Sequence, residues 1–349
     1  MLSTDRILIS IVVVNCNRRD LLLQALDSLS SQDQGGFEVI VVDNGSTDGS
    51  VEAVSSKFTK NASFPVQVIE NSKNHGFCEA NNQGIAVAHG EFVALLNNDA
   101  VAEPQWLSSL LRAFSSGPHV GMAASKIVNY EDPRIIDKAG HLIYPDGQNR
   151  GRGSGEVDTG QFDRVEEVLW PDGCAAMYRR AMLDEIGAFD EDLFAYGDDA
   201  ELGLRARIAG WRCLYIPTAV VRHRRGATLG LLSSRRLELI ERNRVLLAVK
   251  HFPFSLLLLN GFFFAARLVA GFWSGVRGHG EVSRFPGIKG KLLIAAALLK
   301  GDLEALTMIP ATLRKRRALK PLRRLSSKEI RELLLHYRIP LKALTDQAI

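Results

Sequence analysis

The sequence predicts an α/β protein with a mostly parallel central sheet, flanked by helices and followed by a helical C-terminal extension. Apolar segments of strand length, rich in β-branched residues, alternate with segments of helical periodicity through the first hundred residues. Clusters of polar residues directly follow those strands. Residues 222–349 carry 25 Lys/Arg and 8 Asp/Glu, whereas residues 1–221 carry 18 and 31. This asymmetry indicates two tasks on one chain.

Composition narrows the class of protein. A chain of 349 residues can bury a full core, and 46% hydrophobic with 23% charged residues argues against extensive disorder. The four cysteines are far apart and form no CxxC pair, so we expect neither a thiolate metal site nor disulfides, and a reducing compartment. We expect no secretory signal, because the apolar run Ile7–Val14 is short and lacks a cleavage site.

Predicted strands and helices alternate in the first half. Ile7–Val14 is apolar on both faces, as a buried parallel strand is, and Asp20–Leu29 follows as a helix with an Asp cap. The other predicted strands are Phe37–Val42, Val66–Glu70 and Glu91–Leu96. The other predicted helices are Ser50–Phe58 and Ala80–Ala88, with Gly90 placed to end the second.

The next part of the chain is less regular. Pro145–Asp163 is Gly-rich and polar, which predicts a mobile loop over the site or an insertion. Val168–Tyr178 is apolar again, and helices are expected at Ala181–Ile186 and Ala200–Ala209.

Polar residues at the strand ends are the first functional clue. Open parallel sheets bind ligands at the carboxyl ends of their strands. Asn15, Asn17, Asp43 and Asp99 should therefore gather along one edge of the sheet. Asp43 could accept hydrogen bonds from a nucleobase or ribose, and the simpler alternative is an Asx turn or helix cap.

Asn97-Asn98-Asp99 places three polar groups at the end of an apolar strand, which is unfavourable unless something binds there. One carboxylate with neighbouring carbonyl oxygens suits Mg²⁺ or Mn²⁺ bridging a diphosphate, and a polar turn is the alternative.

Two later positions also carry candidate chemistry. Adjacent carboxylates at Asp198 and Asp199 repel, which can raise one pKa and suits a general base, although acids are also common at helix N-termini. His223 follows an apolar segment and could bind a metal ion or be merely structural. Its neighbours Arg222, Arg224 and Arg225 would attract phosphate.

The C-terminal part contains a long apolar segment. Phe252–Val276 has one charge, Arg267, and as a helix would be about 37 Å long, enough to span a bilayer. Because Pro253, Gly261, Gly271 and Arg267 weaken a simple span, we expect a re-entrant or interfacial helix pair, with Leu292–Leu306 as a second apolar helix. A true span, a buried helix and an oligomer contact are the alternatives.

A basic cluster, LRKRRALKPLRRL, occupies residues 313–325. It suits anionic lipid or a lipid-linked diphosphate, and a solvated basic face is the alternative. We see no nucleic-acid-binding motif and expect no nucleic-acid partner.

Together these motifs resemble glycosyltransferase family 2, the inverting GT-A enzymes, and most closely its bacterial rhamnosyltransferase-like branch. The matching segments occur in the family's order between Ile7 and Thr228. They are VVVNCNRRD at 12–20, VVDNGSTDGS at 41–50, NHGFCEANNQGIAVAHGEFVALLNNDA at 74–100 and DGCAAMYRRAMLDEIGAFDEDLFAYGDDAELGLRARIAGWR at 172–212, followed by His223. We see no QxxRW element, which disfavours a processive synthase.

The resemblance implies roles for individual residues. Asp99 and His223 would bind Mg²⁺ or Mn²⁺, with Asn97-Asn98-Asp99 in place of the usual DxD. Asp199 would be the catalytic base beside Asp198. The acceptor site would include Gly173, Cys174 and Ala175. The donor-binding residues would be Val14, Asn15, Asn17, Asp43, Asn44, Asn74, Gly76, Asn81, Asn97 and Asn98.

The resemblance also implies an activity and an architecture. We expect a GT-A catalytic domain at 1–228, with a donor half to about residue 100 and an acceptor half beyond it, and a basic helical region at 229–349. A sugar, with rhamnose from dTDP-rhamnose favoured and UDP-sugars open, would pass to a polyprenyl-linked or polysaccharide acceptor. The expected location is the cytoplasmic face of the cell membrane, and a homo-oligomer is left open.

Two other functions stay open at this point. A sugar-nucleotide nucleotidyltransferase could use a similar α/β domain, but the sequence has no glycine-rich phosphate loop near its N-terminus. A non-catalytic nucleotide-sugar-binding protein could retain the donor site alone.

Overall fold

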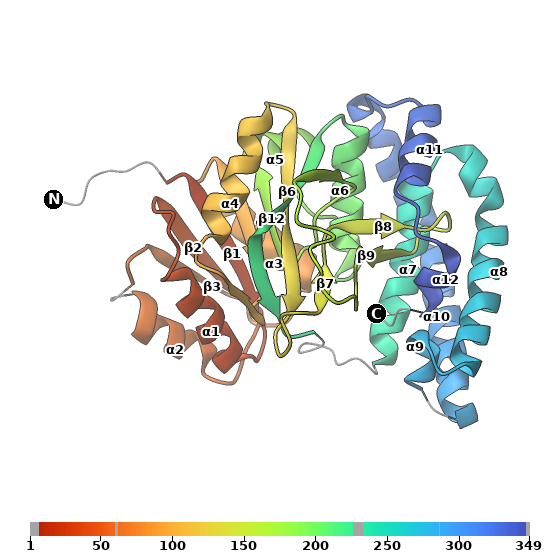
Figure 1. Ribbon diagram of the computed structural model, residues 1–349, viewed down its shortest axis with the longest axis horizontal. Helices are drawn as coiled ribbons and strands as arrows, with labels where there is room; N and C mark the ends of the chain where they lie inside the picture. Colours follow the sequence, from red (N-terminus) through yellow and green to blue (C-terminus); the bar gives the residue numbers. More distant parts are fainter. Residues whose placement is uncertain (1–6, 60–61, 226–232, 286, 347–349) are drawn as a thin grey trace. The chain divides into compact units, whose positions relative to one another are not determined.

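The chain divides into two units. The computed structural model describes residues 7–59, 62–225, 233–285 and 287–346 (Figure 1). Unit 1 comprises Met1–Gly140, Gly155–Arg207 and Trp211–Ala227. Unit 2 comprises His141–Ser154, Ile208–Gly210 and Thr228–Ile349. The boundary predicted at residue 228 lies outside the described residues. Residues 141–154 overlap the first part of the predicted loop Pro145–Asp163. The sequence did not indicate that they would belong to unit 2.

Unit 1 has the predicted α/β composition. Its strands are β1 (Ile9–Asn15), β2 (Phe37–Asp43), β3 (Val66–Glu70), β4 (Phe92–Leu96), β5 (Ala100–Ala102), β6 (Val120–Asn129), β7 (Ile136–Lys138), β10 (Glu166–Val168), β11 (Ala175–Arg179) and β12 (Arg212–His223). Its helices are α1 (Arg19–Leu29), α2 (Ser50–Val54), α3 (Phe77–Val87), α4 (Trp106–Ala113), α5 (Arg180–Ile186) and α6 (Asp198–Ile208). Short turns of other helix types lie at Ser55–Thr59, Phe114–Ser116 and Glu191–Leu193.

These strands form one sheet in the order β10-β12-β6-β11-β4-β1-β2-β3, with β5 beside β12 and β7 beside β6. The strands β3, β2, β1 and β4 are parallel, as predicted. β11 then runs antiparallel to both β4 and β6, while β6 and β12 are parallel. The second half of the sheet is therefore mixed, and its strands carry the residues that complete the site.

Helices cover both faces of the parallel half. Ile11 and Val13 of β1 share a buried cluster with residues of α1 and α4. Val12 points to the opposite face and contacts α3, because a Cβ on Gly84 would lie 2.5 Å from Val12 Cγ1. The α/β fold class is thus confirmed, with α3 packed closely enough that position 84 has no room for a side chain.

Unit 2 is helical. It contains α7 (Ser234–His251), α8 (Phe254–Val276), α9 (Gly280–Ser283), α10 (Gly287–Ala318), α11 (Ser327–His336) and α12 (Leu341–Asp346), a short turn at Lys320–Leu322, and the hairpin of β8 (His141–Ile143) and β9 (Asn149–Gly151). α7 packs along α10. In the described part of the chain, α8 is the one helix long and apolar enough to cross a membrane by length and composition.

Charged groups are buried at the centre of unit 2. Glu241 of α7 pairs with Arg244 at 2.5 Å and with Arg267 of α8 at 2.9 Å. Arg267 also pairs with the fully buried Asp146 at 2.5 Å. The single charge in the apolar segment Phe252–Val276 is therefore turned toward the interior of its unit.

The close packing of α3 can be tested at position 84. We expect Gly84→Val to lower the free energy of unfolding by about 1–3 kcal/mol, because the added atoms would overlap Val12 in a packed layer. The measurement is a urea unfolding curve. The control is Gly35→Val, since nothing lies within 4 Å of a Cβ at position 35. Equal stability of the two variants would contradict the packing described.

Candidate active site

Three parallel strand ends of unit 1 meet at the side chain of Asn15. β1 lies between β2 and β4, and Asn15 is fully buried at its end. Its Nδ2 donates to Asp43 Oδ2 at 3.1 Å. Its Oδ1 accepts from Asn98 Nδ2 at 2.7 Å. The polar strand ends predicted from the sequence are thus brought together in the structure.

The loop after β2 is shaped by two of the predicted donor residues. Asp43 Oδ1 accepts from the backbone N–H of Ser46 at 2.7 Å, which forms the Asx turn considered above. Asn17 has a positive φ of 51° and its Oδ1 accepts from the backbone N–H of Thr47 at 2.8 Å. These contacts fix the loop, and the binding of a nucleoside by Asp43 stays a prediction.

Asn44 joins this loop to the segment before α3. Its Nδ2 donates to Asn74 Oδ1 and to the Gly76 carbonyl, both at 3.0 Å. Gly76 has φ of 90°, and a Cβ there would lie 2.5 Å from the Phe194 ring. A glycine is required at this position because the backbone passes directly beneath that ring.

The remaining predicted donor residues differ in accessibility. Val14 and Asn97 are partly buried. Asn81 is buried, and its Nδ2 donates to the Phe77 carbonyl of its own helix at 2.8 Å.

Asp99 and His223 face each other. β12 pairs with β5 so that His223 is opposite Ala100, which places its ring beside Asp99. Asp99 Oδ1 lies 3.4 Å from His223 Nε2. That oxygen is buried and makes no hydrogen bond with any described residue. Because buried polar atoms normally have hydrogen-bond partners, a buried carboxylate oxygen that makes none and lies beside an imidazole nitrogen fits a divalent cation such as Mg²⁺ or Mn²⁺, which would displace the imidazole proton.

Asp137 on β7 completes this pair and was missed by the sequence analysis. His223 Nδ1 lies 2.7 Å from Asp137 Oδ2, which leaves Nε2 directed at Asp99. Burial would lower the pKa of His223, but the neighbouring Cys174 and the two carboxylates raise it well above its usual value. The one available signal was a charged Asp-Lys pair inside the apolar stretch 135–139.

The arginines around His223 have partners within the protein. Arg222 pairs with Glu103 at 2.7 Å, and Arg225 pairs with Asp137 at 2.6 Å. Arg224 lies over the Tyr130 ring at 3.7 Å. Their expected attraction for phosphate is therefore partly offset by these contacts.

The predicted acceptor segment links the two chemical groups of the site. The Cys174 carbonyl accepts from the backbone N–H of Asn97 at 2.8 Å, beside the Asp99 turn. The Gly173 N–H donates to Asp199 Oδ2 at 3.4 Å, at the start of α6. One loop thus positions Asp199 relative to Asp99. Ala175 begins β11 directly after it.

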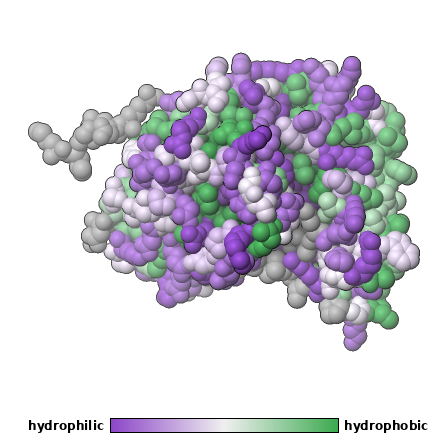
Figure 2. Space-filling model, viewed as in Figure 1, coloured by the Kyte–Doolittle hydropathy of each residue, from purple (hydrophilic) through white to green (hydrophobic). Residues whose placement is uncertain are grey.

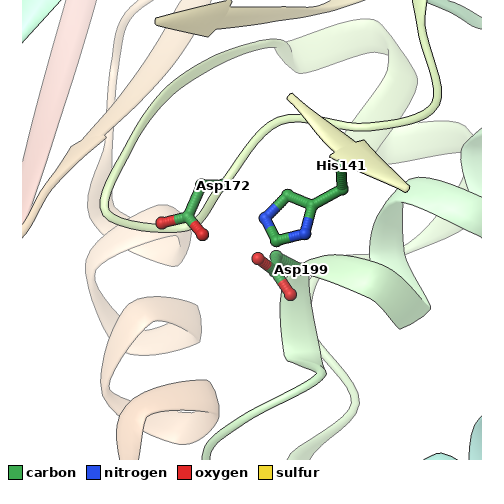
Figure 3. A group of neighbouring side chains, drawn as sticks. All are labelled: His141, Asp172 and Asp199. Carbon is green, nitrogen blue, oxygen red and sulfur yellow. The ribbon is translucent and has the colours of Figure 1, made fainter. Parts of the chain in front are cut away.

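Asp172 at the start of this loop is a further residue that the sequence analysis did not single out. It forms an ion pair with Lys138, and its Oδ1 accepts from the Cys174 N–H at 2.9 Å. Oxygens of Asp172 and Asp199 lie within 4.8 Å of each other (Figure 3). The third residue drawn there, His141, belongs to unit 2.

Asp198 and Asp199 differ in environment. Burial, and next the Asp199 carboxylate, raise the pKa of Asp198 from 3.8 to about 8. Asp199 is partly buried and its Oδ1 accepts from the Ala200 N–H at 2.7 Å. The pair therefore shares one proton near neutral pH, and burial favours the neutral form of Asp198.

The segment before α6 is strained. Phe194 and Tyr196 have φ of 64° and 68°, and with Asn17 they are the non-glycine residues of positive φ in the described ranges. The Phe194 carbonyl accepts from the N–H groups of Phe77 and Cys78, at 2.7 and 3.1 Å. Strain of this kind persists where surrounding contacts hold it, often beside functional groups.

Residues 10–187, just over half of the chain, match the family described as Glycosyl transferase family 2. The chain belongs to this family. It is a glycosyltransferase with the GT-A fold.

Relatives include an N-acetylglucosaminyl-diphospho-decaprenol L-rhamnosyltransferase of Mycobacterium tuberculosis, 28% identical over 63% of this chain and 77% of that protein. The uncharacterized protein y4gI of Sinorhizobium fredii is also 28% identical, over 64% of this chain, and the match spans a quarter of its length.

Solved structures share the fold at low sequence identity. The mannosyltransferase PcManGT from Pyrobaculum calidifontis, in complex with GDP-Man and Mn²⁺, is 20% identical with a TM-score of 0.51, covering 97% of this chain and 86% of that one. S. aureus TarS 1-349 in complex with UDP is 19% identical with a TM-score of 0.53, covering 95% and 91%.

The metal pair of the glycosyltransferase gives one prediction. Asp99→Ala should abolish Mn²⁺ binding in the presence of a nucleoside diphosphate. Asp137→Asn should weaken it by about 10–100-fold, because the imidazole loses the group that orients it. Free Mn²⁺ is measured by electron paramagnetic resonance. Asp132→Asn, which removes a carboxylate paired with Arg134 on a turn, is the control. Unchanged affinity in Asp137→Asn would contradict the assignment.

The protonated Asp198 gives a second prediction. A pKa raised from 3.8 to about 8 favours the folded state below pH 4, and that contribution is lost as the pH rises toward 8. Asp198→Asn should therefore raise the melting temperature relative to wild type by a few degrees at pH 8 and by less at pH 5. A gain that is larger at pH 5 would show that Asp198 is ionised in the folded protein.

Proposed function

We propose that this glycosyltransferase transfers a sugar with inversion from a nucleotide-sugar donor to a polyprenyl-linked or polysaccharide acceptor in cell-surface glycan synthesis. The observation that carries the proposal is the single loop, Asp172–Cys174, that ties the Asp99 turn to Asp199. A cation site and a base held by one short loop suit chemistry on a diphosphate and a hydroxyl together. Rhamnose from dTDP-rhamnose is the donor we would test first, supported by the name of the Mycobacterium tuberculosis relative. UDP-sugars are the second choice.

Asp199 is the proposed general base. The neutral Asp198 beside it leaves one negative charge on the pair, and the Gly173 N–H orients the Asp199 carboxylate. In this position Asp199 would accept the proton of an acceptor hydroxyl as its oxygen attacks the anomeric carbon. A single displacement from the face opposite the leaving group inverts the configuration of that carbon.

Asp99 and His223 are the residues that would hold Mg²⁺ or Mn²⁺, which when bound stabilises the departing nucleoside diphosphate. The contacts of Asn15 with Asp43 and Asn98 hold the predicted nucleotide-binding residues in a fixed position relative to Asp99. Asn44 and Gly76 would form the next part of the donor pocket.

The proposals for the acceptor and for the cellular location are supported by a relative and by unit 2. The name of the same relative specifies a decaprenol-linked acceptor, which would be bound to a membrane. The apolar helix α8 and the basic residues 313–325 are suited to lipid. We therefore propose that the enzyme acts at the cytoplasmic face of the cell membrane, as a peripheral or re-entrant protein.

The role of Asp199 gives a prediction of activity. Asp199→Asn should lower kcat by about 10²–10⁴-fold because the base is lost, while nucleotide binding is retained. Asp198→Asn should lower kcat by less, since its side chain is already neutral near pH 7. Release of the nucleoside diphosphate from each sugar nucleotide is the measurement, and Asp184→Asn on the exposed side of α5 is the control.

The same assay separates the alternatives. Release of inorganic diphosphate from a nucleoside triphosphate would indicate a nucleotidyltransferase. Nucleotide binding without turnover of any donor would indicate a binding protein. Equal activity of wild type and Asp199→Asn would contradict the proposed base.

A further inference from the structure

Exposed apolar side chains are concentrated on α8 and α10. Sixteen of the twenty large hydrophobic side chains that are exposed among the described residues belong to these two helices. We call the exposed hydrophobic residues of α8 and α10 the apolar face. Figure 2 shows hydrophobic residues gathered over α8, at the right-hand edge of the view. Exposed apolar side chains gathered on one surface mark an interaction site, with protein or with membrane.

Spacing along α8 shows that the apolar face is one side of that helix. Six of its nine exposed members recur every three, four or seven positions, at Phe254, Leu258, Phe262, Val269, Trp273 and Val276, and Leu259, Leu268 and Phe272 lie directly beside members of that row. The side chain of Phe262 is 70% exposed and that of Trp273 is 58% exposed. The opposite side of α8 faces the interior of unit 2 and carries apolar residues such as Phe263, which packs against Tyr144, together with polar ones. Arg267 pairs there with Asp146, and Ser274 Oγ donates to the Thr345 carbonyl at 3.0 Å.

α10 continues the apolar face. Leu292, Leu299, Leu303 and Leu306 are exposed at the same helical spacing. Lys291 of α10 lies over the Phe272 ring of α8, 6.0 Å from its centroid. The C-terminal part of α8 and the N-terminal part of α10 therefore approach each other at this contact.

Charge around the apolar face is positive. Residues 254–318 contain ten Lys/Arg and three Asp/Glu. Each of the three acids pairs with an arginine of α7. Glu281 pairs with Arg236 at 2.9 Å, Asp302 with Arg244 at 3.3 Å, and Glu304 with Arg242 at 2.6 Å. Lys289, Lys291 and Arg277 remain exposed. An apolar surface edged with cations matches the headgroup region of an anionic bilayer.

We propose that the apolar face docks on an anionic lipid bilayer with α8 lying in the membrane surface rather than crossing it. This inference rests on the proposed function, because docking on lipid would hold the active site near a lipid-linked acceptor. Lipid is the proposed partner of the apolar face, because the basic residues at its margin would repel those of a second copy of this chain.

The ion pairs of Arg267 favour an α8 that lies in the membrane surface over one that crosses the membrane. A spanning α8 would separate Arg267 from Asp146 and Glu241, since both acids belong to other elements of unit 2. Breaking a buried ion pair and moving its charge into lipid are both unfavourable. The apolar face can reach the lipid without disturbing those pairs, because it lies on the other side of the helix.

Vesicle flotation with the full chain tests the docking. Wild type should bind vesicles of phosphatidylcholine with about a third phosphatidylglycerol, and bind pure phosphatidylcholine vesicles more weakly. Phe262→Glu should lower binding at least tenfold. Leu335→Glu, which changes an exposed leucine of α11 outside the apolar face, should bind as wild type does. Equal binding of Phe262→Glu and wild type, or no vesicle binding at all, would overturn the proposal.

Depth measurements test the orientation. In a Cys16→Ser background, a fluorescent label is placed at Leu258, Ala265 or Val276 and is quenched by lipids that carry the quencher at known depths. A flat helix predicts three similar, shallow depths. A spanning helix predicts the greatest depth at Ala265, and this result would overturn the orientation proposed.

Two further measurements distinguish lipid docking from dimer formation and from a failure of the proposed function. A lipid-free dimer of wild type that Phe262→Glu converts to monomer, without vesicle binding, would assign the apolar face to a second copy and contradict lipid docking. Nucleotide-dependent thermal stabilisation should be unchanged in Phe262→Glu. If nucleotides do not stabilise the wild type either, that result would count against the proposed function and not against the docking.

Discussion

The buried side-chain amide of Asn15 is the contact on which the site depends. It holds the end of β1 to Asp43 at the end of β2 and to Asn98 after β4, so that three strand ends form one surface. Buried polar groups that are fully paired specify a single arrangement, because any other leaves a donor or acceptor unsatisfied. Asn98 directly precedes Asp99, so this network also fixes the start of the cation site. From there the Asn97–Cys174 hydrogen bond continues to the acceptor loop and Asp199.

Much of the donor side could be read from the sequence. Runs such as Phe37–Val42 are apolar on both faces, and they became buried parallel strands with polar residues at their ends. The acceptor side was less accessible. β6 and β12 carry no pattern that shows which strand they join, and the antiparallel placement of β11 is decided by long-range pairing. Asp137 could not be recognised, because its role depends on a strand pairing that brings it to His223.

Unit 2 shows a different limit of sequence analysis. α7 has charged residues all around it and gives no apolar stripe, yet most of the helix is buried. Its arginines are paired inside the unit with acids such as Glu241, Asp302 and Glu304. The strong positive charge of residues 222–349 therefore overstates the charge available at the surface. The exposed cations Arg277, directly after α8, and Lys289 and Lys291 of α10 suit a peripheral membrane contact of the apolar face.

The most direct test of the account is the thermal stabilisation of the wild-type protein by dTDP, UDP and GDP, each with and without Mn²⁺. The strand-end site predicts stabilisation by one nucleotide that depends on the cation and is lost in Asp99→Ala. That nucleotide would also identify the base of the donor. A folded protein that none of the three nucleotides stabilises would contradict a donor site at Asn15, Asp43 and Asp99.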